Sequence, residues 1–146
     1  MSFLSELFKR EQKIPTKKRK TGDEGEQIAS EYLSSLGYNV IRRNVRISHK
    51  EIDIIAENDD YTVIVEVKSI SASYRDATQQ CLRPSNNITR AKIQNILYAA
   101  KSWCTRNYTG KPPRIDVIEV YLGDTPPKVV HLENAINNRA LYRKRR

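Results

Sequence analysis

Two carboxylates near the middle of the chain stand where ionised side chains are unfavourable. Glu66 lies in the run Val63–Lys68 (VIVEVK), which is otherwise almost wholly apolar and β-branched. Asp53 lies in Glu51–Ala56 (EIDIIA), where apolar and acidic residues alternate at first. A buried carboxylate is costly unless it is paired or holds a metal ion. The two acids are therefore candidates for a site.

The two runs are separated by a turn cluster, Asn58–Asp60, which predicts a β-hairpin. With a two-residue turn in that cluster, Asp53 would lie directly opposite Glu66, and Glu51 would lie opposite Lys68. Because side chains alternate along a strand, all four would share one face of the sheet. Two carboxylates opposite each other repel, unless a divalent cation bridges them.

Hard oxygen ligands of this kind suit Mg²⁺ or Mn²⁺. Asp53 and Glu66 would be metal ligands, together with the Val67 carbonyl. Lys68 would orient the attacking water or neutralise charge on a phosphodiester, and Glu26 would complete the metal shell directly or through water. The alternative is a surface ion pair between Glu66 and Lys68, with Asp53 solvated.

Glu26 belongs to a predicted helix from Asp23 to Leu36. Thr21 or Asp23 would cap it, acidic residues would fill its first turn, and Gly37 would end it. Glu26 falls at the edge of the apolar stripe of this helix, so its side chain would point along the boundary of the core.

The remaining pattern predicts an α/β domain in the order α-β-β-β-α-β-β, a mixed β-sheet flanked by helices. A second helix begins at the cap Thr89 and runs to Cys104, after a polar loop at 70–87. The predicted strands cover residues 38–47, 51–56, 62–68, 114–122 and 128–132.

Four other residues are weaker candidates. Lys92, in the first turn of the second helix, would contact a nucleic-acid phosphate or be solvated. His49 lies in a predicted turn just before the acidic strand, and Asp116 would be a structural partner for an arginine. Cys104 lies on the apolar face of the second helix and fits the core.

The formal charge of +9 comes from the two ends of the 146-residue chain. Residues 1–20 carry seven basic and two acidic side chains, and residues 139–146 carry five basic and none acidic. We therefore divide the chain into a basic extension (1–20), a domain (21–138) and a basic tail (139–146). The dense runs would stay unfolded and either bind nucleic acid or solubilise the protein. They consist of Lys17, Lys18, Arg19 and Lys20, and of Arg143, Lys144, Arg145 and Arg146.

Composition excludes several classes of protein. No apolar run of about 18 residues is present, so a membrane span is not expected. The two cysteines, Cys81 and Cys104, and two histidines rule out a disulfide scaffold and a structural zinc site. A reducing, cytoplasmic setting is expected.

Several short motifs together resemble the YraN-like family of uncharacterised bacterial proteins. They are Gly25-Glu26, Leu36-Gly37-Tyr38, Glu51–Ala56, Val65–Lys68 and Arg114–Ile118. That family is similar to the PD-(D/E)xK nucleases, which have the restriction-endonuclease-like fold and include Holliday-junction resolvases. The resemblance implies that Glu26, Asp53 and Glu66 are active-site acids and that Lys68 is the active-site lysine.

This chain also departs from the family pattern. It has Lys50 where relatives have a glycine before the acidic strand, and Ser69-Ile70 where they have Thr-Arg. The second departure removes a phosphate contact.

The expected function is a metal-dependent endonuclease that hydrolyses DNA, with branched or nicked DNA as candidate substrates and DNA favoured over RNA. A homodimer would suit a cut through both strands. The alternatives are a non-catalytic nucleic-acid-binding module that acts through its basic tails, and an interaction protein whose tails dock on RNA or ribosomes. Intact acids favour the nuclease, because acids near a polyanion do not help a pure binder.

Overall fold

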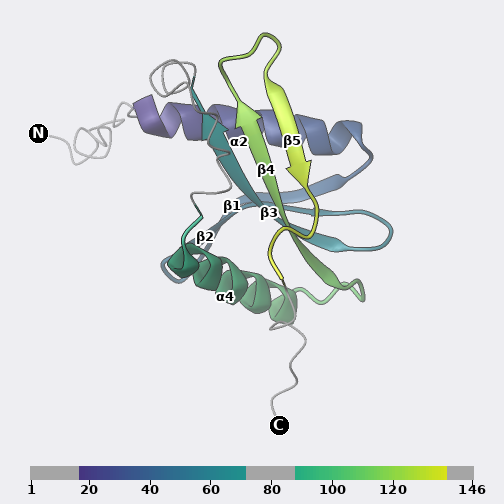
Figure 1. Ribbon diagram of the computed structural model, residues 1–146. Helices are drawn as coiled ribbons and strands as arrows, with labels where there is room; N and C mark the ends of the chain where they lie inside the picture. The colour runs from purple at the N-terminus through teal and green to yellow at the C-terminus, as the bar shows by residue number, and fades with distance from the viewer. Residues whose placement is uncertain (1–16, 72–87, 138–146) are drawn as a thin grey trace, which may run out of the picture.

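A single mixed sheet forms the centre of the protein, and helices lie on both of its sides (Figure 1). The computed structural model describes residues 17–71 and 88–137. The elements in these ranges are α2 (Lys17–Ser35), β1 (Asn39–Ile47), β2 (Lys50–Glu57), β3 (Thr62–Ile70), α4 (Arg90–Arg106), β4 (Pro113–Tyr121) and β5 (Lys128–Leu132). This order confirms the predicted α/β fold.

The strands lie in the sheet in chain order, β1-β2-β3-β4-β5. Strands β1, β2 and β3 form an antiparallel meander, and β4 and β5 form an antiparallel pair. Only β3 and β4 run parallel, so the chain must cross over between them, and α4 lies in that crossover. The acidic strand β2 and the Glu66 strand β3 are therefore interior strands.

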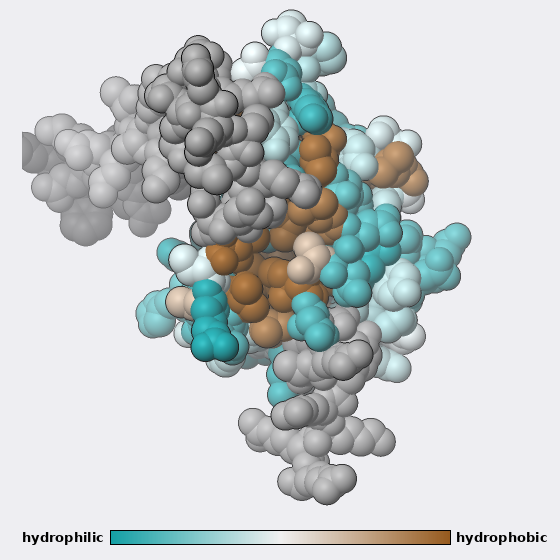
Figure 2. All heavy atoms as spheres, viewed as in Figure 1, coloured by the Kyte–Doolittle hydropathy of each residue, from teal (hydrophilic) through white to brown (hydrophobic). Residues whose placement is uncertain are grey.

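Each helix covers its own apolar core. Ala29 and Leu33 of α2 pack with residues such as Ile54 and Val65 on one face. On the other face, Ile96 of α4 packs with a second cluster that includes Ile64. Figure 2 shows apolar side chains gathered at the centre of one face of the molecule, with hydrophilic residues around them.

The prediction for the start of the first helix was wrong. Helix α2 begins at Lys17, ahead of the predicted caps Thr21 and Asp23, and its first turn contains no acidic residue. The run Lys17–Lys20, predicted to stay unfolded, is helical. Lysine and arginine are good helix formers, and their propensity outweighs repulsion between neighbours here. The predictions for residues 1–16, for 72–87 and for the 143–146 run lie outside the described residues.

Helix α2 lies close to strand β3 at Gly25. A Cβ atom at this position would overlap Ser69 Oγ and lie 3.0 Å from Ser69 Cβ on β3. Only a residue without a side chain allows this approach, and Glu26 follows directly after it. Gly25 therefore sets the distance between the Glu26 backbone and β3.

We expect Gly25→Ala to destabilise the protein by about 1–3 kcal/mol, because the added methyl group forces α2 away from β3. Urea unfolding measures this. Gly22→Ala is the matched control, because it lies one turn earlier in the same helix with nothing within 4 Å of the added atom. It should stabilise by up to about 1 kcal/mol, since alanine favours helix over glycine. Equal effects of both variants would contradict the steric argument.

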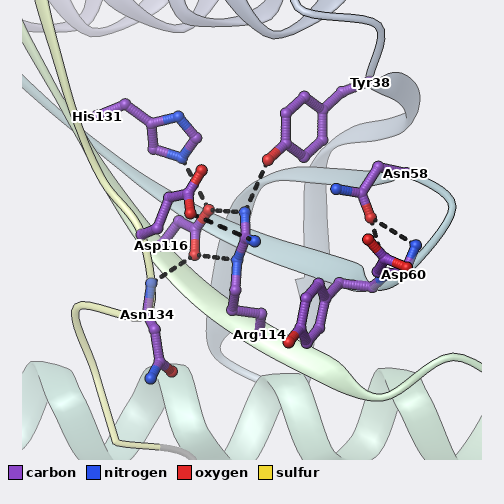
Figure 3. Close-up of polar contacts among 9 residues, drawn as sticks. Tyr38, Asn58, Asp60, Arg114, Asp116, His131 and Asn134 are labelled. Carbon is purple, nitrogen blue, oxygen red and sulfur yellow. Dashed lines mark hydrogen bonds and ion pairs between the residues drawn. The ribbon is translucent and has the colours of Figure 1, made fainter.

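A buried polar network joins β4 to β5 and to Tyr38, which lies between α2 and β1 (Figure 3). Arg114 donates two hydrogen bonds to Asp116, at 2.9 and 2.8 Å, and one to the Tyr38 hydroxyl. Asp116 is fully buried, and it also contacts His131 Nε2 at 2.7 Å and accepts from the Asn134 N–H. The prediction that Asp116 has an arginine partner is confirmed.

The charge of Asp116 is thus fully compensated. Burial alone would raise the pKa of this carboxyl, but the hydrogen bonds from His131, Arg114 and the Asn134 N–H hold the pKa below its usual value. The network keeps Asp116 ionised in the interior and fixes the C-terminal strand to the sheet.

Candidate active site

The predicted hairpin register is confirmed, but the ladder is shorter than predicted. Strands β2 and β3 pair from Glu57–Thr62 to Ile54–Val65, and the ladder ends there. Asp53 and Glu66 lie just beyond its last pair, and the predicted backbone pairing of Glu51 with Lys68 does not form. Instead, the Asp53 carboxylate accepts a hydrogen bond from the Val67 N–H at 2.8 Å. The side chain takes the place of a backbone partner, so the strands separate at the acids.

Glu66 is almost entirely buried, with 3% of its surface exposed. Its Oε1 atom lies 3.3 Å from Lys68 Nζ and 3.3 Å from Lys92 Nζ. One lysine comes from the same strand and the other from the first turn of α4. Lys92 was a weak sequence candidate, and the structure brings it into the acid cluster.

Asp53 carries a strongly perturbed carboxyl group. Burial raises its pKa to about 8, and the nearby charges of Glu66 and Glu26 act in the same direction. The hydrogen bond from Val67 and the charge of Lys92 oppose the increase. The charge of Lys92 therefore does not keep Asp53 ionised at neutral pH.

Glu26, on α2, lies near enough to the cluster for its charge to raise the pKa of Asp53. Burial is the largest cause that raises the pKa of Glu26 itself, while a hydrogen bond from Asn44 and the charge of Arg43 lower it. The charge of Glu51 also raises the pKa of Glu26. Its Oε2 atom is buried without a hydrogen-bond partner.

Asn44 was not predicted as a site residue. It lies within β1 but has a φ of 51°, in the left-handed region that asparagine tolerates better than most residues. The β1–β2 pairs on either side of it, Arg43–Ile54 and Val45–Ile52, place it opposite Asp53. The irregular backbone accompanies the hydrogen bond between its side chain and Glu26.

Hard oxygen donors converge here, but the described side chains alone do not make a complete metal site. Within residues 17–71 and 88–137, no three His, Cys, Asp or Glu side chains are grouped so that they could hold an ion. A backbone ligand is available. In a strand, the N–H and C=O of one residue point toward the same neighbour, so the Val67 carbonyl faces β2 together with the N–H that binds Asp53.

The remaining candidates lie away from the cluster. His49 is exposed in the turn between β1 and β2. Cys104 is half-buried near the C-terminal end of α4, where it lines a groove of about 470 Å³ with Lys101 and Tyr108. In the described part of the chain, no helix is long and apolar enough to cross a membrane.

We expect the metal-free protein to lose stability as pH rises from about 4 to 8. The folded-state pKa of Asp53 is raised, so over this range the folded protein holds a proton that the unfolded chain has released. The stabilisation is complete below about pH 4 and is lost as pH rises through about 8. The slope can reach about 1.4 kcal/mol per pH unit.

Urea unfolding in EDTA at several pH values measures this slope, and Asp53→Asn should flatten it. Asp59→Asn, an exposed residue of the β2–β3 turn, is the control and should keep the wild-type slope. An identical profile for wild type and Asp53→Asn would show that Asp53 titrates normally.

The fold and the cluster together define an α/β protein with a carboxylate–lysine site at a point where two strands of a mixed sheet separate. Comparison with known proteins gives the family. Residues 25–120 match the model of UPF0102, described as an uncharacterised protein family, and the chain belongs to it. The matched range contains every residue of the cluster.

The relatives have similar lengths and belong to diverse bacteria. A UPF0102 protein of Symbiobacterium thermophilum is 39% identical over 106 residues, 72% of this chain and 85% of that protein. One of Caldanaerobacter subterraneus is 37% identical, over 81% of this chain and 95% of that protein. One of Dehalococcoides mccartyi is 30% identical, over 82% and 94% respectively.

Proposed function

We propose that this protein is a metal-dependent endonuclease that hydrolyses phosphodiester bonds in DNA. The observation that carries the proposal is the raised pKa of Asp53, beside the buried Glu66 and within reach of Glu26. Acids gathered in this way destabilise a protein unless a cation or a proton compensates them. Perturbed acids beside lysines are typical of catalytic sites.

Each residue has a distinct role in this proposal. Asp53, Glu66 and the Val67 carbonyl would hold Mg²⁺ or Mn²⁺, and the unpartnered Glu26 oxygen would complete the shell through a bound water. The ion would supply an activated water and Lewis-acid stabilisation when bound. Lys68 would orient the water and neutralise charge that develops on the phosphate. Lys92 would bind a substrate phosphate from the first turn of α4.

The direct test is cleavage by the wild-type protein. Labelled linear, nicked, branched and single-stranded DNA and RNA are incubated with Mg²⁺, Mn²⁺ or EDTA. We expect metal-dependent cleavage of DNA, and a rise in melting temperature when metal is added. If no substrate is cut and metal has no effect on melting, the alternative of a non-catalytic nucleic-acid-binding module replaces the nuclease.

Lys68→Ala should lower the rate of cleavage by about 100-fold or more while metal binding stays near wild type. Lys92→Ala is the matched variant, because both lysines lie 3.3 Å from the same Glu66 oxygen. Lys92→Ala should mainly weaken substrate binding. Single-turnover cleavage and calorimetric metal titration separate these effects. Equal loss of rate in both variants would mean that the lysines act only by neutralising Glu66.

A further inference from the structure

The free edge of the sheet beside the acids is rich in arginine. Strand β1 is the first strand of the sheet, so among the strands that the structure describes none pairs with its outer side. From residue 39 to residue 50 the chain has four basic residues and no acidic one. Arg42 and Arg46 are exposed, whereas Arg43 donates a hydrogen bond to Gln27 and Lys50 lies over the Tyr98 ring.

The two exposed arginines lie on either side of the acid cluster along β1, but on opposite faces of the sheet. Arg42 pairs with Ile55 of the α4-side core, whereas Arg46 lies between Val45 and Ile47, which both pack on that core. The β1–β2 register puts Asn44 opposite Asp53, so Arg42 and Arg46 lie two residues to either side of that position. At about 3.3 Å per residue, their backbones are about 13 Å apart. Measured along the axis of a duplex, that distance corresponds to about four base-pair steps. Neighbouring strands are about 4.8 Å apart, so β1 lies one strand from Asp53 on β2 and two strands, about 10 Å, from Glu66 on β3.

Both arginine side chains are free to bind a ligand, as far as the described part of the chain shows. Within residues 17–71 and 88–137, neither Arg42 nor Arg46 makes a side-chain hydrogen bond or an ion pair, although Glu51 is the strand partner of Arg46. The acids at the site repel phosphate. A polyanionic substrate can approach them only if nearby cations hold its backbone, and guanidinium groups bind phosphate through paired donors.

We propose that the exposed edge of β1 binds the phosphodiester backbone of a nucleic acid through Arg42 and Arg46 and places it beside the acid cluster. This inference rests on the proposed function, because it takes nucleic acid as the substrate. It puts the main phosphate-binding surface on the folded domain rather than on the basic ends.

The test is the salt dependence of binding by the full chain, measured by fluorescence anisotropy in EDTA with a labelled DNA duplex. Arg42→Gln/Arg46→Gln should reduce the slope of log affinity against log salt by about 0.9 for each phosphate that the arginines neutralise, or about 1.8 for two phosphates. Single-stranded DNA serves as the second arm, with a smaller change of about 0.7 for each phosphate.

Lys101→Gln/Lys128→Gln is the matched control. It removes the same charge from two exposed lysines, one on α4 and one on the opposite edge strand, and should leave the slope close to wild type. An unchanged slope in the arginine variant, or an equal reduction in the control, overturns the proposal. Increased aggregation with unchanged binding would show that the arginines only protect the edge strand from pairing.

Failure of this inference can be separated from failure of the nuclease. Metal-dependent cleavage by wild type together with an unchanged salt slope in the arginine variant leaves the enzyme but rejects the β1 surface. A reduced slope without cleavage by wild type supports the surface in a binding protein.

Discussion

Asp53→Asn should abolish the metal-induced rise in melting temperature and lower phosphodiester cleavage by about 100-fold or more. The substitution keeps the shape of the side chain but removes its charge and one hard ligand oxygen. At a free metal concentration about 100 times Kd, linkage gives about 2.7 kcal/mol of stabilisation to wild type, and the variant should show almost none. Thermal melts with and without Mg²⁺ or Mn²⁺, together with cleavage rates, measure both effects.

Above about pH 8 the metal-free variant should be at least as stable as wild type, since wild-type Asp53 is ionised there and is repelled by Glu66 and Glu26. This distinguishes loss of a ligand from loss of the fold. Asp59→Asn controls for removal of a carboxylate from the same hairpin and should behave as wild type. Cleavage that survives in Asp53→Asn would place the activity outside this cluster.

Asp116→Asn should cost about 3–5 kcal/mol of unfolding free energy, the largest stability effect that we expect. It leaves the Arg114 guanidinium in the interior without its counter-charge and weakens the interactions with His131 and Asn134. The pKa of Asp116 is held low, so this stability exists above about pH 4 and is lost as pH falls through the folded-state pKa. The pH dependence of stability from Asp116 is thus opposite in sign to that from Asp53, whose contribution is lost as pH rises.

Glu133→Gln is the matched control for Asp116→Asn. Glu133 Oε2 lies 3.7 Å from Arg114 Nη1, but the Glu133 side chain is 59% exposed, so the pair should contribute less than about 1 kcal/mol. Chemical denaturation of both variants at pH 7 gives the comparison. Similar losses of stability in the two variants would mean that burial does not set the strength of the Arg114 pairs.

The features that depend on neighbouring residues could be predicted from the sequence. The turn at Asn58 and its neighbours fixes the β2–β3 register, and this local rule placed Asp53 and Glu66 opposite each other. Thr89 was predicted as a cap from its residue type and position. In the structure its hydroxyl accepts a hydrogen bond from the Lys92 N–H, three residues ahead. Both interactions span few residues, so the sequence pattern contains them.

Lys92 and Asn44 show where sequence reasoning stops. The ion pair of Lys92 with Glu66 depends on how α4 docks on the sheet, whereas the pattern of α4 alone favours a solvated lysine. The positive φ of Asn44 depends on the Glu26 carboxylate reaching β1 from another element. The only local signal for Asn44 was asparagine in a strand, where this residue is unfavourable.

The end of the β2–β3 ladder was missed for a similar reason. Period-two alternation predicts continuous pairing through Asp53, because it considers only side-chain direction. The Asp53 carboxylate accepts the hydrogen bond from the Val67 N–H that a backbone carbonyl of β2 would accept in a continuous ladder. A polar side chain that can bond to the backbone therefore marks a position where a ladder can end.

The parallel pairing of β3 with β4 imposes an order on folding. Partners in the β2–β3 hairpin, such as Ile54 and Val65, are 11 residues apart, whereas the β3–β4 partners Val65 and Asp116 are 51 apart. Closing the longer loop costs more chain entropy, so we expect the meander to form first and β4 to dock later. Both central acids and Lys68 belong to the early meander, whereas Lys92 belongs to the crossover. Asp53 and Glu66 of the early hairpin therefore repel each other during the first part of folding. When α4 docks and completes the core, it also brings the Lys92 ammonium group to Glu66.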